Sequence, residues 1–166
     1  LETSCTSCDS GKYQHENSKA GAVCSFCATG MSYSSAPEAC VNCDEGKYQA
    51  ENNAPGVSCK YCAVGFKYTS VTTACTSCPT GKYQSENDRS SATCSFCNVG
   101  KQFNSKSTKC DDCEAGKYQD QSSALTTTTS CKFCAAGMRF MLTTTTCQPC
   151  ATGLYQTEAD KASADC

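Results

Sequence analysis

The spacing of the cysteines constrains the fold of this chain more than any other feature. Nine Cys-x-x-Cys pairs begin at residues 5, 24, 40, 59, 75, 94, 110, 131 and 147, and a single cysteine stands at 166. The intervals between pairs alternate between 15 and 12 residues, with one interval of 17. Self-similarity at a fixed period predicts a tandem array. Each repeat therefore consists of two modules. We call the module with the wider interval between its cysteine pairs the long module, and the module with the 12-residue interval the short module.

The array divides into four repeats and part of a fifth. The predicted repeats are 5–39, 40–74, 75–109, 110–146 and the partial repeat 147–166. Three repeats are 35 residues long, and the fourth is longer by two residues. Because the pattern is already running at both ends, we expect the chain to be a segment of a longer array.

Each module carries a glycine three residues after its first cysteine. In the long modules Lys-Tyr-Gln and a polar loop follow this glycine, with Leu154 replacing lysine in the last copy. In the short modules an aromatic residue follows three positions after the glycine. A glycine at a fixed offset predicts a turn with positive φ, and Lys-Tyr-Gln predicts a short strand. Alternate Cys-x-x-Cys pairs contain a third set of aromatic residues. From the three sets together we expect each small module to use one aromatic residue to cover a disulfide.

The composition does not allow a large hydrophobic core. Leu, Val and Phe together number 16, Ile and Trp are absent, and 19 of the 166 residues are cysteine. Crosslinks therefore have to replace the core, because closing a loop of about 15 residues removes roughly 3 kcal/mol of unfolded-state entropy. We predict a small disulfide-rich fold, mostly irregular with short β-hairpins, with little helix and no globular core. The modules are expected to form an elongated rod.

The cysteine content also predicts the cellular compartment. So many disulfides persist only under oxidising conditions, which indicates an extracellular or cell-surface location. The sequence contains no apolar run of about 18 residues, which is the length that would predict a membrane span. We therefore expect no direct membrane insertion of this segment. The net charge is only −2 and the charges are interspersed, which argues against a nucleic-acid partner.

The motif Cys-x-x-Gly-Lys-Tyr, followed by a polar loop and a cysteine, resembles the first module of tumour-necrosis-factor-receptor cysteine-rich repeats. It is also similar to ephrin-receptor-like cysteine-rich repeats. The resemblance covers residues 5–166 and implies that each module is closed by its own disulfide. The implied pairs are Cys8–Cys24, Cys27–Cys40, Cys43–Cys59, Cys62–Cys75, Cys78–Cys94, Cys97–Cys110, Cys113–Cys131, Cys134–Cys147 and Cys150–Cys166. Cys5 is left over, and its partner would belong to a preceding module.

Spacing alone leaves two other uses of the cysteines open. One is a shifted pairing, with Cys5 bonded to Cys24 and Cys8 to Cys27. The other is an array of zinc sites with four cysteine ligands each, because Cys-x2-Cys-x15-Cys-x2-Cys is a legitimate spacing for tetrahedral thiolate ligands.

Other candidate sites are few. Two threonine runs precede cysteines and are either exposed spacers or acceptors of O-linked glycans. The candidate acceptors are Thr126, Thr127, Thr128, Thr129, Thr143, Thr144, Thr145 and Thr146. The polar Gln-x-Glu loops are interpreted as solvated turns. The only histidine, His15, has no counterpart in the other copies. We expect no enzyme activity, no catalytic residue, no cofactor and no resident metal.

These observations favour a structural repeat segment of an extracellular filament, appendage, matrix or surface coat, stiffened by serial disulfide loops. The expected partners are neighbouring copies of the chain, other filament or coat proteins, and glycans. A receptor or adhesion ectodomain that binds a protein ligand is the alternative, and the fourth repeat is then the candidate surface because it differs from the others. A zinc-binding array is the third hypothesis.

Overall fold

The computed structural model describes residues 7–16, 20–35, 38–121 and 129–166. Cys5, Thr126, Thr127 and Thr128, which were named as candidates above, lie outside the described residues. Within the described part the chain forms ten strands of two residues each and no helix. The prediction of a disulfide-rich, mostly irregular fold with short hairpins is therefore confirmed.

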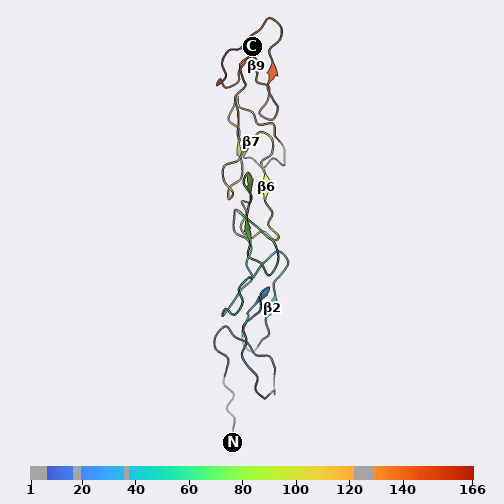
Figure 1. Ribbon diagram of the computed structural model, residues 1–166, viewed down its shortest axis with the longest axis vertical. Coiled ribbons are helices and arrows are strands. Elements are labelled where there is room, and N and C mark those ends of the chain that lie inside the picture. The colour runs from blue at the N-terminus through green and yellow to red at the C-terminus, as the bar shows by residue number, and fades with distance from the viewer. Residues whose placement is uncertain (1–6, 17–19, 36–37, 122–128) are drawn as a thin grey trace. The chain divides into compact units, whose positions relative to one another are not determined.

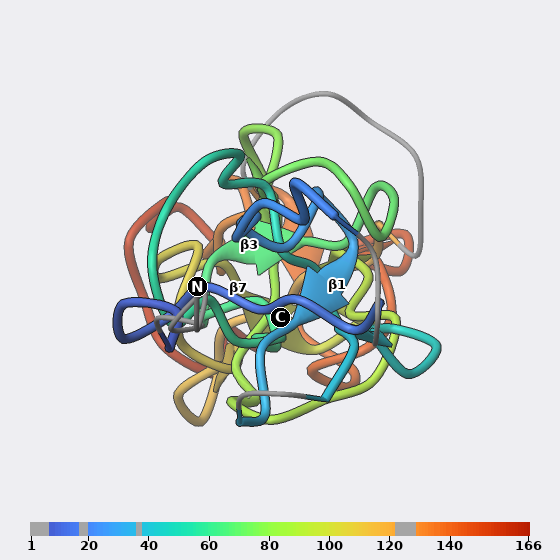
Figure 2. The same ribbon diagram turned by 90° about the horizontal axis from the view of Figure 1, so that it is seen from below.

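The strands pair into five two-stranded sheets (Figure 1). The pairs are β1 (Met31–Ser32) with β2 (Val41–Asn42), β3 (Phe66–Lys67) with β4 (Thr76–Ser77), β5 (Lys82–Tyr83) with β6 (Ser95–Phe96), β7 (Lys101–Gln102) with β8 (Asp111–Asp112), and β9 (Met138–Arg139) with β10 (Gln148–Pro149). Figure 2, a view from below, shows how small the strands are beside the loops that connect them.

In the Cys-x-x-Cys pairs after the first, the spacer provides either the second strand of a hairpin or a single bridge residue. In the first short module, β1 follows Gly30 and pairs antiparallel with β2, which is the spacer Val41–Asn42. In the long modules the tyrosine of Lys-Tyr-Gln pairs with the first spacer residue. These pairs are Tyr13–Ser25, Tyr48–Lys60, Tyr83–Ser95 and Tyr118–Lys132. The predicted Lys-Tyr strand is thus a full strand in the third long module and a single bridge in the first, second and fourth.

Nine disulfides close the modules. They join Cys8–Cys24, Cys27–Cys40, Cys43–Cys59, Cys62–Cys75, Cys78–Cys94, Cys97–Cys110, Cys113–Cys131, Cys134–Cys147 and Cys150–Cys166. These are the pairs that the resemblance implies, and Cys24 and Cys27 bond to Cys8 and Cys40 rather than in the shifted pairing. The bonded Cα atoms are 5.5–5.7 Å apart, which is ordinary disulfide geometry.

Cysteines, small side chains and four glutamines make up most of the buried interior in the described residues. The first cysteine of every complete short module is almost fully buried, as are Ala92 and Ala164. In the clearest cluster, Tyr118, Met138 and Phe140 pack against the disulfide of Cys134 and Cys147. Aromatic residues therefore do cover a disulfide here, which substitutes for the missing aliphatic core.

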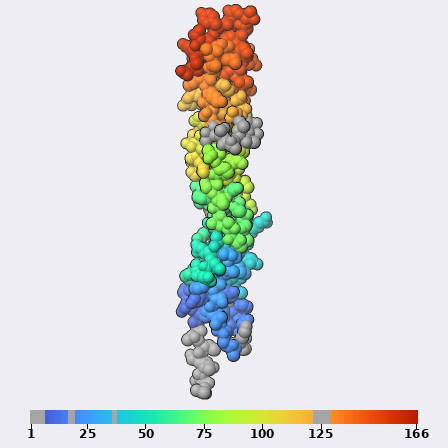
Figure 3. All heavy atoms as spheres, in the orientation of Figure 1, coloured from blue at the N-terminus to red at the C-terminus, as the bar shows by residue number. Residues whose placement is uncertain are grey.

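The chain folds as two compact units. Unit 1 consists of Leu1–Ala63, Lys67–Thr76 and Asn87–Ala92, and unit 2 of Val64–Phe66, Ser77–Glu86 and Thr93–Cys166. Within unit 2 the modules follow one another in chain order, from green through yellow to red (Figure 3). The five repeat boundaries inferred from the sequence remain a prediction.

Candidate functional site

The most regular feature of the structure is a joint between modules at each glutamine of Lys-Tyr-Gln. The backbone N–H of Gln49 donates to the carbonyl of Val71 in the following short module, at 2.9 Å. The carbonyl of Gln49 accepts from the N–H of Gly30 in the preceding short module, at 2.8 Å. Gln84 and Gln119 are held in the same way on both sides. One residue thus ties together two modules that flank its own.

A second hydrogen bond reinforces each joint. The N–H of the short-module aromatic residue donates to a carbonyl in the loop of the next long module. The pairs are Tyr33–Val57, Tyr68–Ala92, Phe103–Thr129 and Phe140–Ala164, at 2.7–2.9 Å. The loop residues that accept these bonds are all buried. Every short module in the described chain therefore contacts its following long module through two backbone hydrogen bonds, from its glycine and its aromatic residue.

The glutamine side chains are buried, which the sequence analysis missed. Gln49, Gln84, Gln119 and Gln156 are only 2–7 % exposed. In each, the amide Nε2 donates to the backbone carbonyl two residues further along, as Gln49 does to Glu51 at 2.8 Å. This bond fixes the start of the loop in the way that Asn and Asp side chains fix turns. The signal was present in the sequence, because glutamine recurs at this place in all five long modules.

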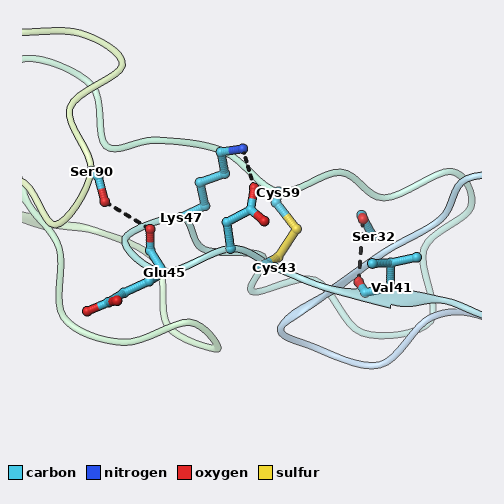
Figure 4. A network of polar contacts seen from close by, with 8 residues as sticks. Ser32, Val41, Cys43, Glu45, Lys47, Cys59 and Ser90 are labelled. Atoms are coloured by element: carbon cyan, nitrogen blue, oxygen red, sulfur yellow. Dashed lines mark hydrogen bonds and ion pairs between the residues drawn. A yellow bond between two sulfur atoms is a disulfide. The ribbon is translucent and has the colours of Figure 1, made fainter.

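In three long modules the glycine, which is Gly11, Gly46 or Gly116, lies directly against the loop of the next long module. A methyl group added at Gly46 would overlap the hydroxyl of Ser90 and the backbone nitrogen of Ser91. The same hydroxyl of Ser90 donates to the carbonyl of Glu45 at 2.9 Å (Figure 4). Gly46 also has a φ of +83°, so both its conformation and its surroundings exclude a side chain.

A lysine in each of the first four long modules lies over the ring of the aromatic spacer residue. The distances from Nζ to the ring centroid are 5.2 Å for Lys12 and Phe26, 5.1 Å for Lys47 and Tyr61, 4.3 Å for Lys82 and Phe96, and 4.8 Å for Lys117 and Phe133. Cation–π contacts of this kind at exposed sites contribute about 0.5–1 kcal/mol. The lysine side chain thereby links the first strand of the long module to its spacer.

In three of these modules the same lysine also pairs with an acid three residues earlier. Lys47 approaches Asp44 at 2.7 Å, and Lys117 approaches Glu114 at 2.6 Å (Figure 4 shows the Lys47 pair). The hydrogen bond and charge of Lys47 lower the pKa of Asp44, and those of Lys117 lower the pKa of Glu114. The hydrogen bond from Asp44 raises the pKa of Lys47. These groups are exposed, so salt weakens the pairs.

A shallow hollow of about 230 Å³ lies in the first long module. Tyr13, His15, Ala22 and Val23 line it, and the rings of Tyr13 and His15 stack with centroids 5.7 Å apart. Ala22 is exposed, whereas Val57, Ala92 and Ala164 at the matching positions are buried. The hollow therefore lies at the position that, in the other long modules, contacts the aromatic residue of the preceding short module.

The threonine candidates differ in accessibility. Thr144, Thr145 and Thr146 are exposed, and Thr143 is partly buried with its carbonyl bound to the N–H of Gln119. Thr129 is only 8 % exposed. A glycan on Thr129 would have to break the packing of its module. Among the described candidates, the exposed three are the more suitable acceptors, and their modification remains a prediction.

The bonded cysteines are unsuitable for an array of four-cysteine zinc sites. A disulfide sulfur is not a thiolate, and zinc requires thiolate ligands. In the described residues no three His, Cys, Asp or Glu side chains converge in a way that could hold a metal ion. None of the described segments forms a helix that is long and apolar enough to cross a membrane.

Comparison with known proteins does not assign the chain to a family. The chain matches no family model, and no curated protein matches it significantly. What is shown is a series of disulfide-bonded cysteine-rich repeats. Such a series is typical of extracellular or secreted structural and ectodomain modules.

Proposed function

We propose that this chain is a structural repeat segment of an extracellular filament, appendage, matrix or surface coat. The observation that supports this role most is the glutamine joint. Gln49, Gln84 and Gln119 each bind the short module before and the short module after their own. The contacts thus pass from module to neighbouring module, as they do in repeat proteins whose units contact only their neighbours.

The disulfides suit the same role. Each module is crosslinked at its own ends, so a module that loses its hydrogen bonds stays closed. The modules are then connected only by two-residue spacers, which are themselves hairpin strands. Little free chain therefore separates neighbouring modules. A filament or coat protein benefits because proteases need accessible, flexible segments to cleave.

The proposed role involves no catalysis. A repeated scaffold needs no reactive group, and His15, the only histidine in the sequence, is exposed and stacked on Tyr13. Under this proposal the partners are neighbouring copies of the chain or other filament or coat proteins, and the exposed threonines 144–146 are available to carry glycans.

Electron microscopy of the native material, prepared without reduction, tests the proposal. Regular fibres or a lattice with a repeating subunit are the expected result, with additional density at Thr144–Thr146 if glycans are attached. The matched control is the same material after reduction, which should lose its order because the modules depend on disulfides. Dispersed particles without any polymer would argue against the structural role.

A receptor or adhesion role is the second candidate, and a particular observation favours it. Met141 and Leu142 are 42 % and 60 % exposed. The other short modules carry polar residues at these places, namely Ser34–Ser35, Thr69–Ser70 and Asn104–Ser105. If the fourth repeat binds a protein ligand, changing Met141→Thr and Leu142→Ser should abolish capture of that ligand without unfolding the module. Unchanged capture would remove this surface from consideration.

A further inference from the structure

The disulfides and the Cys-x-x-Cys spacers form one continuous covalent path along the chain. Each module begins at one cysteine and ends at the cysteine bonded to it, and the next module begins three residues later. From Cys8 to Cys166 the path consists of nine disulfides and the eight spacers between them. The loops of the modules branch off this path. A pull along the chain is therefore transmitted through disulfides and spacers, and the loops are bypassed.

The spacers on this path are already extended. Five of them are the two-residue strands β2, β4, β6, β8 and β10. In the other three, the first spacer residue, which is Ser25, Lys60 or Lys132, forms an antiparallel bridge with a tyrosine. A β-strand rises about 3.3 Å per residue, close to the limit of about 3.3–3.6 Å for a fully stretched chain. A pull can therefore turn the spacers but hardly lengthen them.

The disulfides keep the two ends of each loop close together. The bonded Cα atoms are 5.5–5.7 Å apart, although they are 13, 16 or 18 positions apart in the sequence. Disulfides and extended spacers together limit a 35-residue repeat to about 32 Å, and the distance between Cys8 and Cys166 to about 130 Å. Both limits are about a quarter of the stretched length of the same chain without crosslinks. They hold for any arrangement of the modules.

The contacts between modules are noncovalent. The N–H of Tyr33 donates to the carbonyl of Val57, and that of Tyr68 to the carbonyl of Ala92, each at 2.8 Å. A single hydrogen bond of this kind contributes little net free energy, so it breaks far more easily than a covalent bond. Under tension the modules should separate first, and the chain should then stop lengthening at the limit set by its disulfides.

We propose that this chain carries tension, as a tether whose maximum length is fixed by its disulfides. The load passes along disulfides and spacers, and the hydrogen bonds between modules allow a small yield before the limit is reached. The inference rests on the proposed structural role, because a filament, matrix or coat is a setting in which a pull acts along the chain. It adds a second task for the crosslinks, which limit the length of the chain as well as stabilising its modules.

Single-molecule force spectroscopy of the full chain, held by handles at its two ends, tests the proposal. Without reductant the distance between Cys8 and Cys166 should not exceed about 130 Å, once the length of residues 1–7 is subtracted. Dithiothreitol, added under tension, reduces the disulfides one at a time and is itself oxidised to a cyclic disulfide. Each opening should lengthen the chain by about 40 Å in a short module, by about 50 Å where the separation is 16, and by about 57 Å for Cys113–Cys131.

Matched variants separate the covalent path from the contacts between modules. Changing Cys62 and Cys75 together to serine should raise the length limit by about 40 Å without reductant, and should remove one short-module step from the reduction series. Gly46→Ala instead crowds Ser90 and Ser91 in the next long module. It should lower the force at which the chain begins to yield and leave the length limit unchanged. The reduction steps of the unaltered chain still test the proposal if the serine variant misfolds.

Two results would overturn the proposal. One is an extension clearly beyond the limit in the unaltered chain without reductant, which would mean that the disulfides do not form one continuous path. The other is a series of reduction steps whose lengths do not follow the number of residues that each disulfide encloses. Neither result bears on whether the native material forms fibres, and microscopy of that material does not depend on the length limit. The two proposals can therefore fail separately.

Discussion

The long modules 43–59 and 150–166 share a motif and a disulfide separation of 16 residues, but they differ in what covers them. In the first, Gly46 lies against Ser90 and Ser91, and Tyr48 is paired with Lys60. In the second, no described residue beyond the two chain neighbours of Gly153 lies within 4 Å of a methyl group built on this glycine, and Tyr155 is exposed. The local turn is nevertheless the same. The motif therefore sets the shape of a module, and its neighbours provide much of its burial.

Loss of a disulfide should give the largest loss of stability. It should also show how far each module stabilises its neighbours. Opening either 16-residue crosslink with paired Cys→Ser changes should cost about 3 kcal/mol in the chain-entropy account. The Cys43–Cys59 loss should also expose the amides of Gly30 and Tyr33, whose acceptors lie in that module. Removal of Cys150–Cys166 should affect Gly137 and Phe140. Hydrogen exchange checks this, and a purely local loss of protection in both variants would contradict neighbour support.

Glycine-to-alanine changes should separate the cost of a steric overlap with a neighbouring module from the cost of backbone strain. Gly46 and Gly153 have nearly the same φ, +83° and +86°, so alanine costs about 1–2 kcal/mol of backbone strain at either place. At Gly46 the added methyl must also displace Ser90 and Ser91, for about 1–3 kcal/mol more. Hydrogen exchange of the Gln49 and Gln156 amide regions measures the two losses. Equal losses would mean that the close approach at Gly46 does not stabilise the module.

The buried glutamine should behave alike in both modules, because its side-chain bond is internal. Gln49 donates to the carbonyl of Glu51, and Gln156 to that of Glu158. Changing either to alanine removes one hydrogen bond and buried volume, and should cost about 1–3 kcal/mol. The test compares local opening free energies of the two variants. A much smaller loss in module 150–166 would show that the glutamine also depends on its neighbours.

Features of the fold that are set within one module could be predicted from the sequence, whereas features that depend on contacts between modules could not. The glycines, the short hairpins and the disulfide-rich fold follow from spacing and composition, because each is set within one module. The burial of Gln49 is harder to derive, because its backbone is bound by Val71 and Gly30 in flanking modules; the recurrence of glutamine at this place was the only signal for it. The Lys47–Tyr61 contact was missed for a similar reason, because the two residues are brought together only when the spacer pairs as a strand.

The ion pair of Asp44 and Lys47 should cause the smallest difference in stability between the two modules. Because Lys47 lowers the pKa of Asp44, this carboxylate stabilises its module at neutral pH, and the contribution is lost as the pH falls below about 4. The raised pKa of Lys47 has the opposite sign, so its contribution is lost only above about pH 10. Module 150–166 has Ala151 and Leu154 instead and lacks this dependence.

An NMR titration of the Asp44 carboxyl decides whether the pair operates in solution. In the unaltered chain its pKa should lie below the ordinary value, and Lys47→Gln should return it toward that value. The same change removes the positive charge from the face of Tyr61, so protection of the Tyr48–Lys60 pair should decrease slightly. Addition of salt should reproduce the pKa change while leaving the ring contact in place. If Lys47→Gln leaves the Asp44 pKa unchanged, the module is held by its strand pair and neighbours alone, and the charges contribute solubility rather than structure.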